Sequence, residues 1–172
     1  YLKHPMETLL RLQINILCIL FLLVALSSVK RSGGKRKADD HLDITLYRLF
    51  AAAVIVLLAT DALTWLWDGA GGAGIRLGLT AATALYYAFQ GLPASFYILY
   101  ADYQLNRSAV RLRRRLRLLL PLNLLIFAAA AASPATGLLF RIDEAGRYSR
   151  GGAGFYVYAA VLLVLAFFSF LP

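Results

Sequence analysis

The stretch LDITLYRLFAAAVIVLLATDALTWLW, residues 42–67, is apolar over nearly its whole length. A helix needs roughly 20 apolar residues to cross the hydrocarbon core of a bilayer, because each residue advances it by about 1.5 Å. Comparable stretches occupy residues 7–29, 75–105, 116–132 and 155–171. The sequence therefore predicts an all-α integral membrane protein, folded as a bundle of about five transmembrane helices.

The composition of the chain agrees with this prediction. Of the 172 residues, 60% are hydrophobic and 16% are charged, whereas soluble domains average about half apolar and about a quarter charged residues. The formal net charge of +9 would also suit a nucleic-acid-binding protein. However, the basic residues concentrate in short segments beside apolar stretches, as in membrane proteins. We therefore expect the lipid bilayer as a partner and no nucleic acid.

Basic residues also predict the orientation of the bundle. Two cation-rich segments follow the first and third apolar stretches and contain Lys30, Arg31, Lys35, Arg36, Lys37, Arg107, Arg111, Arg113, Arg114, Arg115 and Arg117. The opposite side carries fewer cations, namely Lys3, Arg76, Arg141, Arg147 and Arg150. Because short cation-rich loops stay in the cytoplasm, the amino terminus is predicted outside, in a multi-pass protein of the cytoplasmic membrane.

The connection between the fourth and fifth stretches has a β pattern. In residues 137–151, apolar residues alternate with others, and a Glu-Ala-Gly turn precedes Tyr148. Such alternation around a turn indicates a short β-hairpin. We expect this hairpin outside the membrane, as a lid over the mouth of the bundle, with Phe140 and Asp143 as candidate ligand contacts. An ordinary polar connector is the alternative.

Polar side chains within the apolar stretches are candidates for function, because each is costly to bury in lipid. Asp61 is the foremost candidate, since it lies in the outer third of its helix, where it must find a hydrogen-bond or cationic partner or be protonated. Trp65 lies one turn further on and shares its face. The other polar candidates are Gln13, Asn15, Gln90 and Asn123. The alternative is that these groups only tie helices together, each hydrogen bond contributing about 1 kcal/mol.

The third stretch is rich in tyrosine and is interrupted by Gly91-Leu92-Pro93. Proline removes one backbone hydrogen bond, so a kink is expected there. A kinked, tyrosine-lined helix opposite Asp61 would suit a small-ligand pocket, with Tyr86 and Tyr97 as candidate contacts. Aromatic packing is the alternative. Asp102, at the inner end of this helix, is expected to form an ion pair with the arginine run.

The sequence predicts no catalytic site. His4 and His41 lie outside the predicted spans, so a pair of intramembrane histidine ligands for haem or a metal is not expected. No serine–histidine or paired-carboxylate arrangement lies within the spans. We therefore expect no enzymatic activity, no cofactor and no metal in these residues.

Three stretches resemble the membrane-sensor half of bacterial signalling proteins. They are TDALTW at 60–65, LPASFYILYADYQ at 92–104 and LFRIDEAGRYSRG at 139–151. The resemblance is to diguanylate cyclases, in which a catalytic GGDEF domain follows a seven-helix bundle, and to related sensor kinases. It implies that this chain, which begins with Tyr1 and stops at Pro172, is a fragment of such a bundle. Two further helices and a cytoplasmic output domain would then follow it.

The leading functional hypothesis treats residues 1–172 as a transmembrane sensor domain. It would bind a small extracytoplasmic ligand and control a cytoplasmic output, with a homodimer as one possible arrangement. The alternative is a small-molecule transporter or a substrate-binding membrane subunit, although the sequence shows no matched pair of broken helices. A scaffold subunit without a pocket is a third class.

Overall fold

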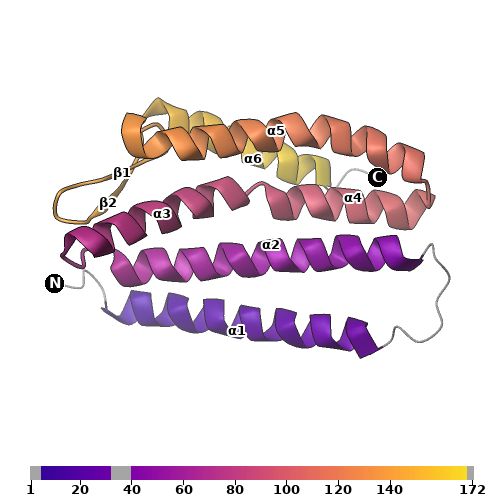
Figure 1. The fold of residues 1–172 in the computed structure, drawn as a ribbon, viewed down its shortest axis with the longest axis horizontal. Helices are drawn as coiled ribbons and strands as arrows, with labels where there is room; N and C mark the ends of the chain where they lie inside the picture. The colour runs from indigo at the N-terminus through magenta and orange to yellow at the C-terminus, as the bar shows by residue number, and fades with distance from the viewer. Residues whose placement is uncertain (1–4, 32–39, 170–172) are drawn as a thin grey trace.

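The computed structural model describes residues 5–31 and 40–169. These residues form six helices and one two-stranded sheet (Figure 1). In chain order the elements are α1 (Pro5–Arg31), α2 (Asp40–Trp67), α3 (Ala73–Phe89), α4 (Leu92–Asn106), α5 (Ala109–Thr136), β1 (Phe140–Ile142), β2 (Tyr148–Arg150) and α6 (Ala153–Ser169). The fold is therefore all-α apart from the hairpin.

Several helices have the length and character of membrane spans. Within the described ranges, three segments are long and apolar enough to cross a membrane: Leu9–Ser28, Leu42–Trp67 and Ala109–Thr136. Gly154–Val164 is a shorter apolar stretch. The outward faces of α1 and α5 expose many leucine and isoleucine side chains. Soluble proteins rarely expose contiguous apolar surface on this scale, so the fold indicates a membrane protein.

The helices run alongside one another, and the chain reverses direction at the ends of the bundle (Figure 1). α2 packs against α1 on one side and against α3 and α4 on the other, while α5 contacts both α3 and α4, and α6 contacts α4. One end, called here the hairpin end, holds β1, β2 and the turn 68–72 between α2 and α3. The opposite end holds the turn between α4 and α5 and the arginines 111–117, and is called the arginine end.

The expected single helix over 75–105 is instead two helices, α3 and α4, which meet at Gln90 and Gly91. Pro93 causes this interruption, because it cannot donate a backbone hydrogen bond to the carbonyl four residues earlier and its ring clashes with that carbonyl. The Gly91 carbonyl accepts hydrogen bonds from the backbone N–H and the hydroxyl of Ser95, at 3.2 and 3.0 Å. The kink expected from the sequence is therefore a change of helix.

α5 also begins earlier than the expected residue 116. Its first residue is Ala109, and the Ser108 hydroxyl caps the helix by accepting a hydrogen bond from the Arg111 N–H at 3.4 Å. A serine in this position satisfies one of the N–H groups that a first helical turn leaves free. The arginines at 111–117 are consequently helical and do not form a connecting loop.

The main buried core lies beneath the hairpin, between α3, α5 and α6. Phe140 of β1 is fully buried and stacks on Tyr87 of α3, with ring centroids 5.7 Å apart and an interplanar angle of 4°. The buried Ser133 hydroxyl of α5 accepts hydrogen bonds from the N–H groups of Leu139 and Phe140, both at 3.0 Å. The hairpin is therefore anchored in the core at its β1 side.

The second strand and the turn of the hairpin are attached to a different part of the bundle. β1 and β2 pair antiparallel, with Phe140 opposite Arg150 and Ile142 opposite Tyr148. The Gly146 carbonyl accepts a hydrogen bond from the Gly69 N–H at 2.9 Å. Gly146 itself has φ +71°, a conformation that favours glycine. The hairpin thus bridges the core and the turn that ends α2.

Candidate functional site

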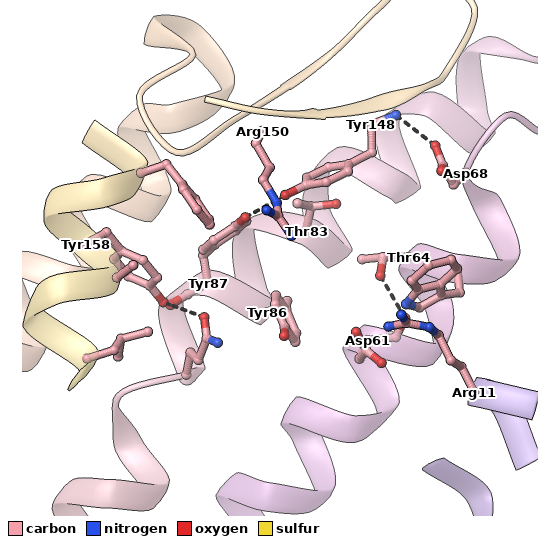
Figure 2. Close-up of a pocket in the computed structure, with 15 residues that line it drawn as sticks. Arg11, Asp61, Thr64, Asp68, Thr83, Tyr86, Tyr87, Tyr148, Arg150 and Tyr158 are labelled. Carbon is pink, nitrogen blue, oxygen red and sulfur yellow. Dashed lines mark hydrogen bonds between the residues drawn. The ribbon is translucent and has the colours of Figure 1, made fainter. Parts of the chain in front are cut away.

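A cavity of about 460 Å³ opens beneath the hairpin (Figure 2). Its volume falls within the range of about 300–1,000 Å³ that is usual for small-molecule pockets. Side chains from α1, α2, α3, β2 and α6 meet there. The lining residues are Arg11, Asp61, Thr64, Trp65, Asp68, Thr83, Tyr86, Tyr87, Gln90, Tyr148, Arg150, Phe155, Tyr158, Ala159 and Leu162.

Asp61 forms the acidic part of the wall on α2. Its Oδ2 atom accepts a hydrogen bond from Nδ2 of Asn15 on α1 at 2.7 Å, and Asn15 is only 7% exposed. One turn further along α2, the ring of Trp65 lies 4.3 Å from the guanidinium carbon of Arg11. A guanidinium over an indole ring is a favourable cation–π arrangement. α1 therefore contributes both a neutral partner for Asp61 and a cation at the edge of the cavity.

Tyrosine hydroxyls form the opposite part of the wall. The hydroxyls of Tyr87 on α3 and Tyr148 on β2 are 2.6 Å apart. On α6, the Tyr158 hydroxyl lies 2.7 Å from the Tyr87 carbonyl oxygen and 2.9 Å from Oε1 of Gln90, to either of which it can donate. Gln90 stands between α3 and α4, so these bonds connect the interruption in the helix to the hairpin and to α6.

β2 covers the cavity and is held in place by the end of α2. The Tyr148 N–H donates a hydrogen bond to Oδ1 of Asp68 at 2.7 Å. Successive residues of a strand point to opposite faces, so Tyr148 and Arg150 share the face towards the cavity. Figure 2 shows both side chains reaching down from the hairpin, and the Arg150 guanidinium carbon lies 5.3 Å from the Phe155 ring.

Thr83 of α3 is the most deeply buried polar residue of the wall. Its side chain is almost inaccessible, and among the described residues its Oγ1 has no hydrogen-bond partner. A buried hydroxyl without a partner costs about 1–3 kcal/mol. Because Thr83 lines the cavity, a molecule bound there could supply the partner that this hydroxyl lacks.

The structure brings together some of the candidate residues and separates others. Asp61, Trp65, Tyr86 and Gln90 line the cavity, and Asn15 supports it through Asp61. The remaining five candidates, Gln13, Tyr97, Asn123, Phe140 and Asp143, are not among its lining residues.

Each of these five side chains has a different setting. Gln13 is exposed on α1. Tyr97 is 42% exposed and packs its ring against Phe50. Asn123 of α5 donates hydrogen bonds to Oγ of Ser95 at 2.8 Å and to the Leu119 carbonyl at 2.9 Å, which ties α5 to α4.

The two hairpin candidates are structural in this arrangement. Phe140 belongs to the core behind the cavity and stacks on Tyr87. Asp143 stabilises the turn, where its Oδ1 accepts a hydrogen bond from the Arg147 N–H at 2.8 Å. Both side chains are occupied by contacts within or beneath the hairpin, and the hairpin residues that line the cavity, Tyr148 and Arg150, lie on β2 instead.

Sequence reasoning did not single out several residues that line the cavity, namely Arg11, Asp68, Thr83, Arg150 and the α6 residues. The α6 contribution follows a helical spacing, since Phe155, Tyr158, Ala159 and Leu162 lie on one face at intervals of three and four. The alternation around Tyr148 also placed Arg150 on the same face of a strand. These signals were present, but neither shows by itself which face meets a cavity.

A second polar cluster lies at the arginine end. Asp102 is 3% exposed, and its Oδ1 lies 3.1 Å from Arg115 Nη2 and 3.3 Å from Arg111 Nε. Arg107 pairs instead with Asp43 of α2 at 3.4 Å. The ion pair expected for Asp102 is thus confirmed, with partners on α5. It closes the bundle at the end opposite the cavity.

Comparisons with protein-family models, with curated proteins and with solved structures find no match to this chain. In the part of the chain that the structure describes, no group of three or more histidine, cysteine, aspartate or glutamate side chains could hold a metal ion.

Proposed function

We propose that this chain is a membrane-embedded sensing domain, which binds a small ligand on the extracytoplasmic side and controls a cytoplasmic signalling output. The bundle would cross the bilayer about five times, with α3 and α4 together making one crossing. The arginine end faces the cytoplasm, because short basic segments stay on that side. The hairpin end is then external, and the location is the cytoplasmic (inner) membrane.

The observation that carries this proposal is the position and the lining of the cavity. Charged and hydroxyl-bearing side chains converge there from α1, α2, α3, β2 and α6. Polar groups at the depth of a membrane are costly and usually mark a binding or transport site. Because the walls come from so many elements, one bound molecule would contact most of the bundle at once. That is the property a sensor needs.

The joint between α3 and α4 offers a route from the cavity to the arginine end. Gln90 lines the cavity at this joint and accepts a hydrogen bond from Tyr158 of α6. The other end of α4 carries Asp102, which is paired to α5. A ligand that prefers one arrangement of this joint would shift the population of that arrangement by its differential affinity.

The output in this proposal belongs to a domain that follows the bundle, and the chain itself is not an enzyme. The resemblance of the three sequence stretches favours a diguanylate cyclase, with a histidine kinase as the other candidate. The ligand-induced change in the arrangement of the bundle would reach that domain through the last helix or through a changed arrangement of a homodimer.

Ligand binding by the 172-residue chain tests this proposal directly. The protein would be reconstituted in lipid nanodiscs, and its thermal unfolding would be followed against a library of small metabolites. A compound at 100 times its dissociation constant should stabilise the fold by about 2.7 kcal/mol. Tyr86→Phe should weaken binding, while Tyr97→Phe, which removes the same hydroxyl outside the cavity, should not. A library without any stabilising compound would argue against a sensing domain.

A transporter would share such a cavity but would also move its ligand across the bilayer. The same chain in sealed liposomes, supplied with a radiolabelled hit, distinguishes the two functions. Binding without accumulation supports the sensor. Accumulation above that of protein-free liposomes contradicts it.

A further inference from the structure

The charges of the cavity indicate the kind of molecule it binds. Arg11 and Arg150 contribute cationic groups, and Asp61 and Asp68 contribute carboxylates, of which Asp68 already accepts the Tyr148 N–H. Among the residues with described positions, neither guanidinium lies within ion-pair distance of a carboxylate, whereas three arginines at the opposite end are paired with Asp43 and Asp102. Unneutralised charge of both signs at one site suits a ligand that carries both signs.

We infer that the ligand is a small zwitterion, an amino acid with an apolar side chain, whose carboxylate is bound by Arg150 and Thr83 and whose ammonium group is bound by Asp61. This inference rests on the proposed ligand-binding function. It names the chemical class of the ligand and the side chains that recognise it.

The carboxylate end follows from two donors that line the cavity, the exposed Arg150 and the buried Thr83. Arg150 reaches into the cavity from β2 and is steadied over the ring of Phe155 (Figure 2). Its planar guanidinium can donate two parallel hydrogen bonds to a carboxylate. Thr83 is 2% exposed, lines the same cavity and has no partner for its hydroxyl within the described ranges. A carboxylate oxygen in the cavity would supply the acceptor that this buried hydroxyl lacks.

The ammonium end follows from the setting of Asp61. Asn15 holds one carboxylate oxygen, Oδ2, at 2.7 Å, and no ion pair is formed with the other within the described residues. An ammonium group has three donors and would bind this carboxylate directly. Tyr86 lines the cavity beside it (Figure 2), and an aromatic face adds to the attraction for a cation. Arg11 does not take this place, because its guanidinium lies over Trp65.

The volume of the cavity limits the size of the ligand, and its apolar lining residues indicate the kind of side chain that the ligand carries. A volume of about 460 Å³ suits a single small molecule and excludes a folded partner. Ala159 and Leu162 of α6 provide an apolar surface away from the charged groups. An apolar amino-acid side chain would bury its surface there and gain the hydrophobic contribution.

Matched ligand analogues test the inference on the unmodified chain. Phenylalanine carries both charges, whereas phenethylamine keeps only the positive charge and 3-phenylpropanoate keeps only the negative charge; all three share a phenyl ring. Leucine, isopentylamine and 4-methylpentanoate form a second such set. Isothermal titration calorimetry in nanodiscs would compare their affinities. We expect an amino acid to bind at least tenfold more tightly than either analogue that lacks one charged group. An amine or an acid that binds as tightly as its amino acid would overturn the inference.

Two substitutions assign the charged ends to residues. Arg150→Gln should weaken amino-acid binding at least tenfold and leave the amine unchanged, whereas Asp61→Asn should weaken the amino acid and leave the acid unchanged. Arg141→Gln and Glu144→Gln, exposed positions of the same hairpin region, serve as matched controls. Equal losses for all three compounds in both variants would contradict the assignment. If other compounds stabilise the chain and no amino acid does, the ligand class is wrong and the sensing function stands; if nothing binds, both fail.

Discussion

The hydroxyl of Tyr87 lies 2.6 Å from the hydroxyl of Tyr148, and this contact joins α3 to the hairpin across the cavity. Tyr87 also stacks on Phe140 of the other strand. One helical residue therefore contacts both strands of the hairpin, through its ring on one side and through its hydroxyl on the other. Tyr87 is thus one of several attachments of the hairpin, beside the bonds of Ser133 to β1 and of Asp68 to β2.

Removal of the Tyr148 hydroxyl should loosen the β2 side of the lid. Tyr148→Phe keeps the ring and deletes one hydrogen bond, so a cost of about 0.5–1.5 kcal/mol is expected. Hydrogen–deuterium exchange of the hairpin amides in nanodiscs would report it as faster exchange in residues 146–150, with the helices unchanged. Tyr156→Phe is the control, because Tyr156 is exposed on α6. Unchanged exchange in Tyr148→Phe would show that the hydroxyl pair does not hold the lid.

Asn15 should be the residue that fixes α1 against α2. Its bond to Asp61 crosses between the two helices, and interhelical hydrogen bonds in membranes contribute about 0.6 to 2 kcal/mol. We expect Asn15→Leu to lower the unfolding free energy by that amount. Gln13→Leu should be neutral or slightly stabilising, since Gln13 is exposed on α1. Equilibrium unfolding of both variants in mixed micelles would check this difference, and equal effects would contradict it.

The contrast between Gln13 and Asn15 shows what a sequence pattern can predict here. The length and apolar character of residues 7–29 predicted a helix, and the structure has α1 at Pro5–Arg31. Side chains that are two positions apart on a helix point in directions that differ by roughly 200° about its axis. Only one of these two amides could therefore face α2. The choice depends on the rotation of α1 about its axis. That rotation is fixed by packing against α2 and by the partner at position 61.

Contacts between distant segments were the part that local patterns could not predict. Alternation and a Glu-Ala-Gly turn predicted a hairpin within residues 137–151, and β1 pairs with β2 inside that range. The attachment of Gly146 to Gly69, and of Tyr148 to Asp68, joins residues far apart in the chain. This attachment is what brings Arg150 to the cavity. Tyr97 does not line the cavity for a similar reason, because it follows the interruption at Gly91 and so belongs to a separate helix, α4.

The buried carboxylate at the arginine end should contribute strongly to stability. Asp102 is nearly inaccessible, while its partners Arg111 and Arg115 are partly exposed at 51% and 27%. Asp102→Asn removes the charge from the buried side and leaves arginines that water can still reach. We therefore expect a loss of about 1–3 kcal/mol, below the full cost of breaking a completely buried pair. Thermal unfolding would measure it, with the exposed Glu144→Gln as the neutral control. A loss within about 0.3 kcal/mol of the control would mean that the pair is solvated.

Ser133 provides the sharpest test of how the hairpin is anchored in the core. Its side chain is fully buried on α5, and its hydroxyl oxygen accepts from the N–H groups of both Leu139 and Phe140. Ser133→Ala would leave these two buried donors without a partner, and each such donor costs about 1–3 kcal/mol. We expect a total loss of at least 2 kcal/mol and weaker ligand binding, because β1 and β2 would shift together. Ser27→Ala, which removes an exposed hydroxyl that donates to the Val24 carbonyl of its own helix α1, should change neither quantity. Full stability of Ser133→Ala would show that these two amides find other hydrogen-bond partners. The stacked rings of Tyr87 and Phe140 would then be the main contact that anchors the hairpin in the core.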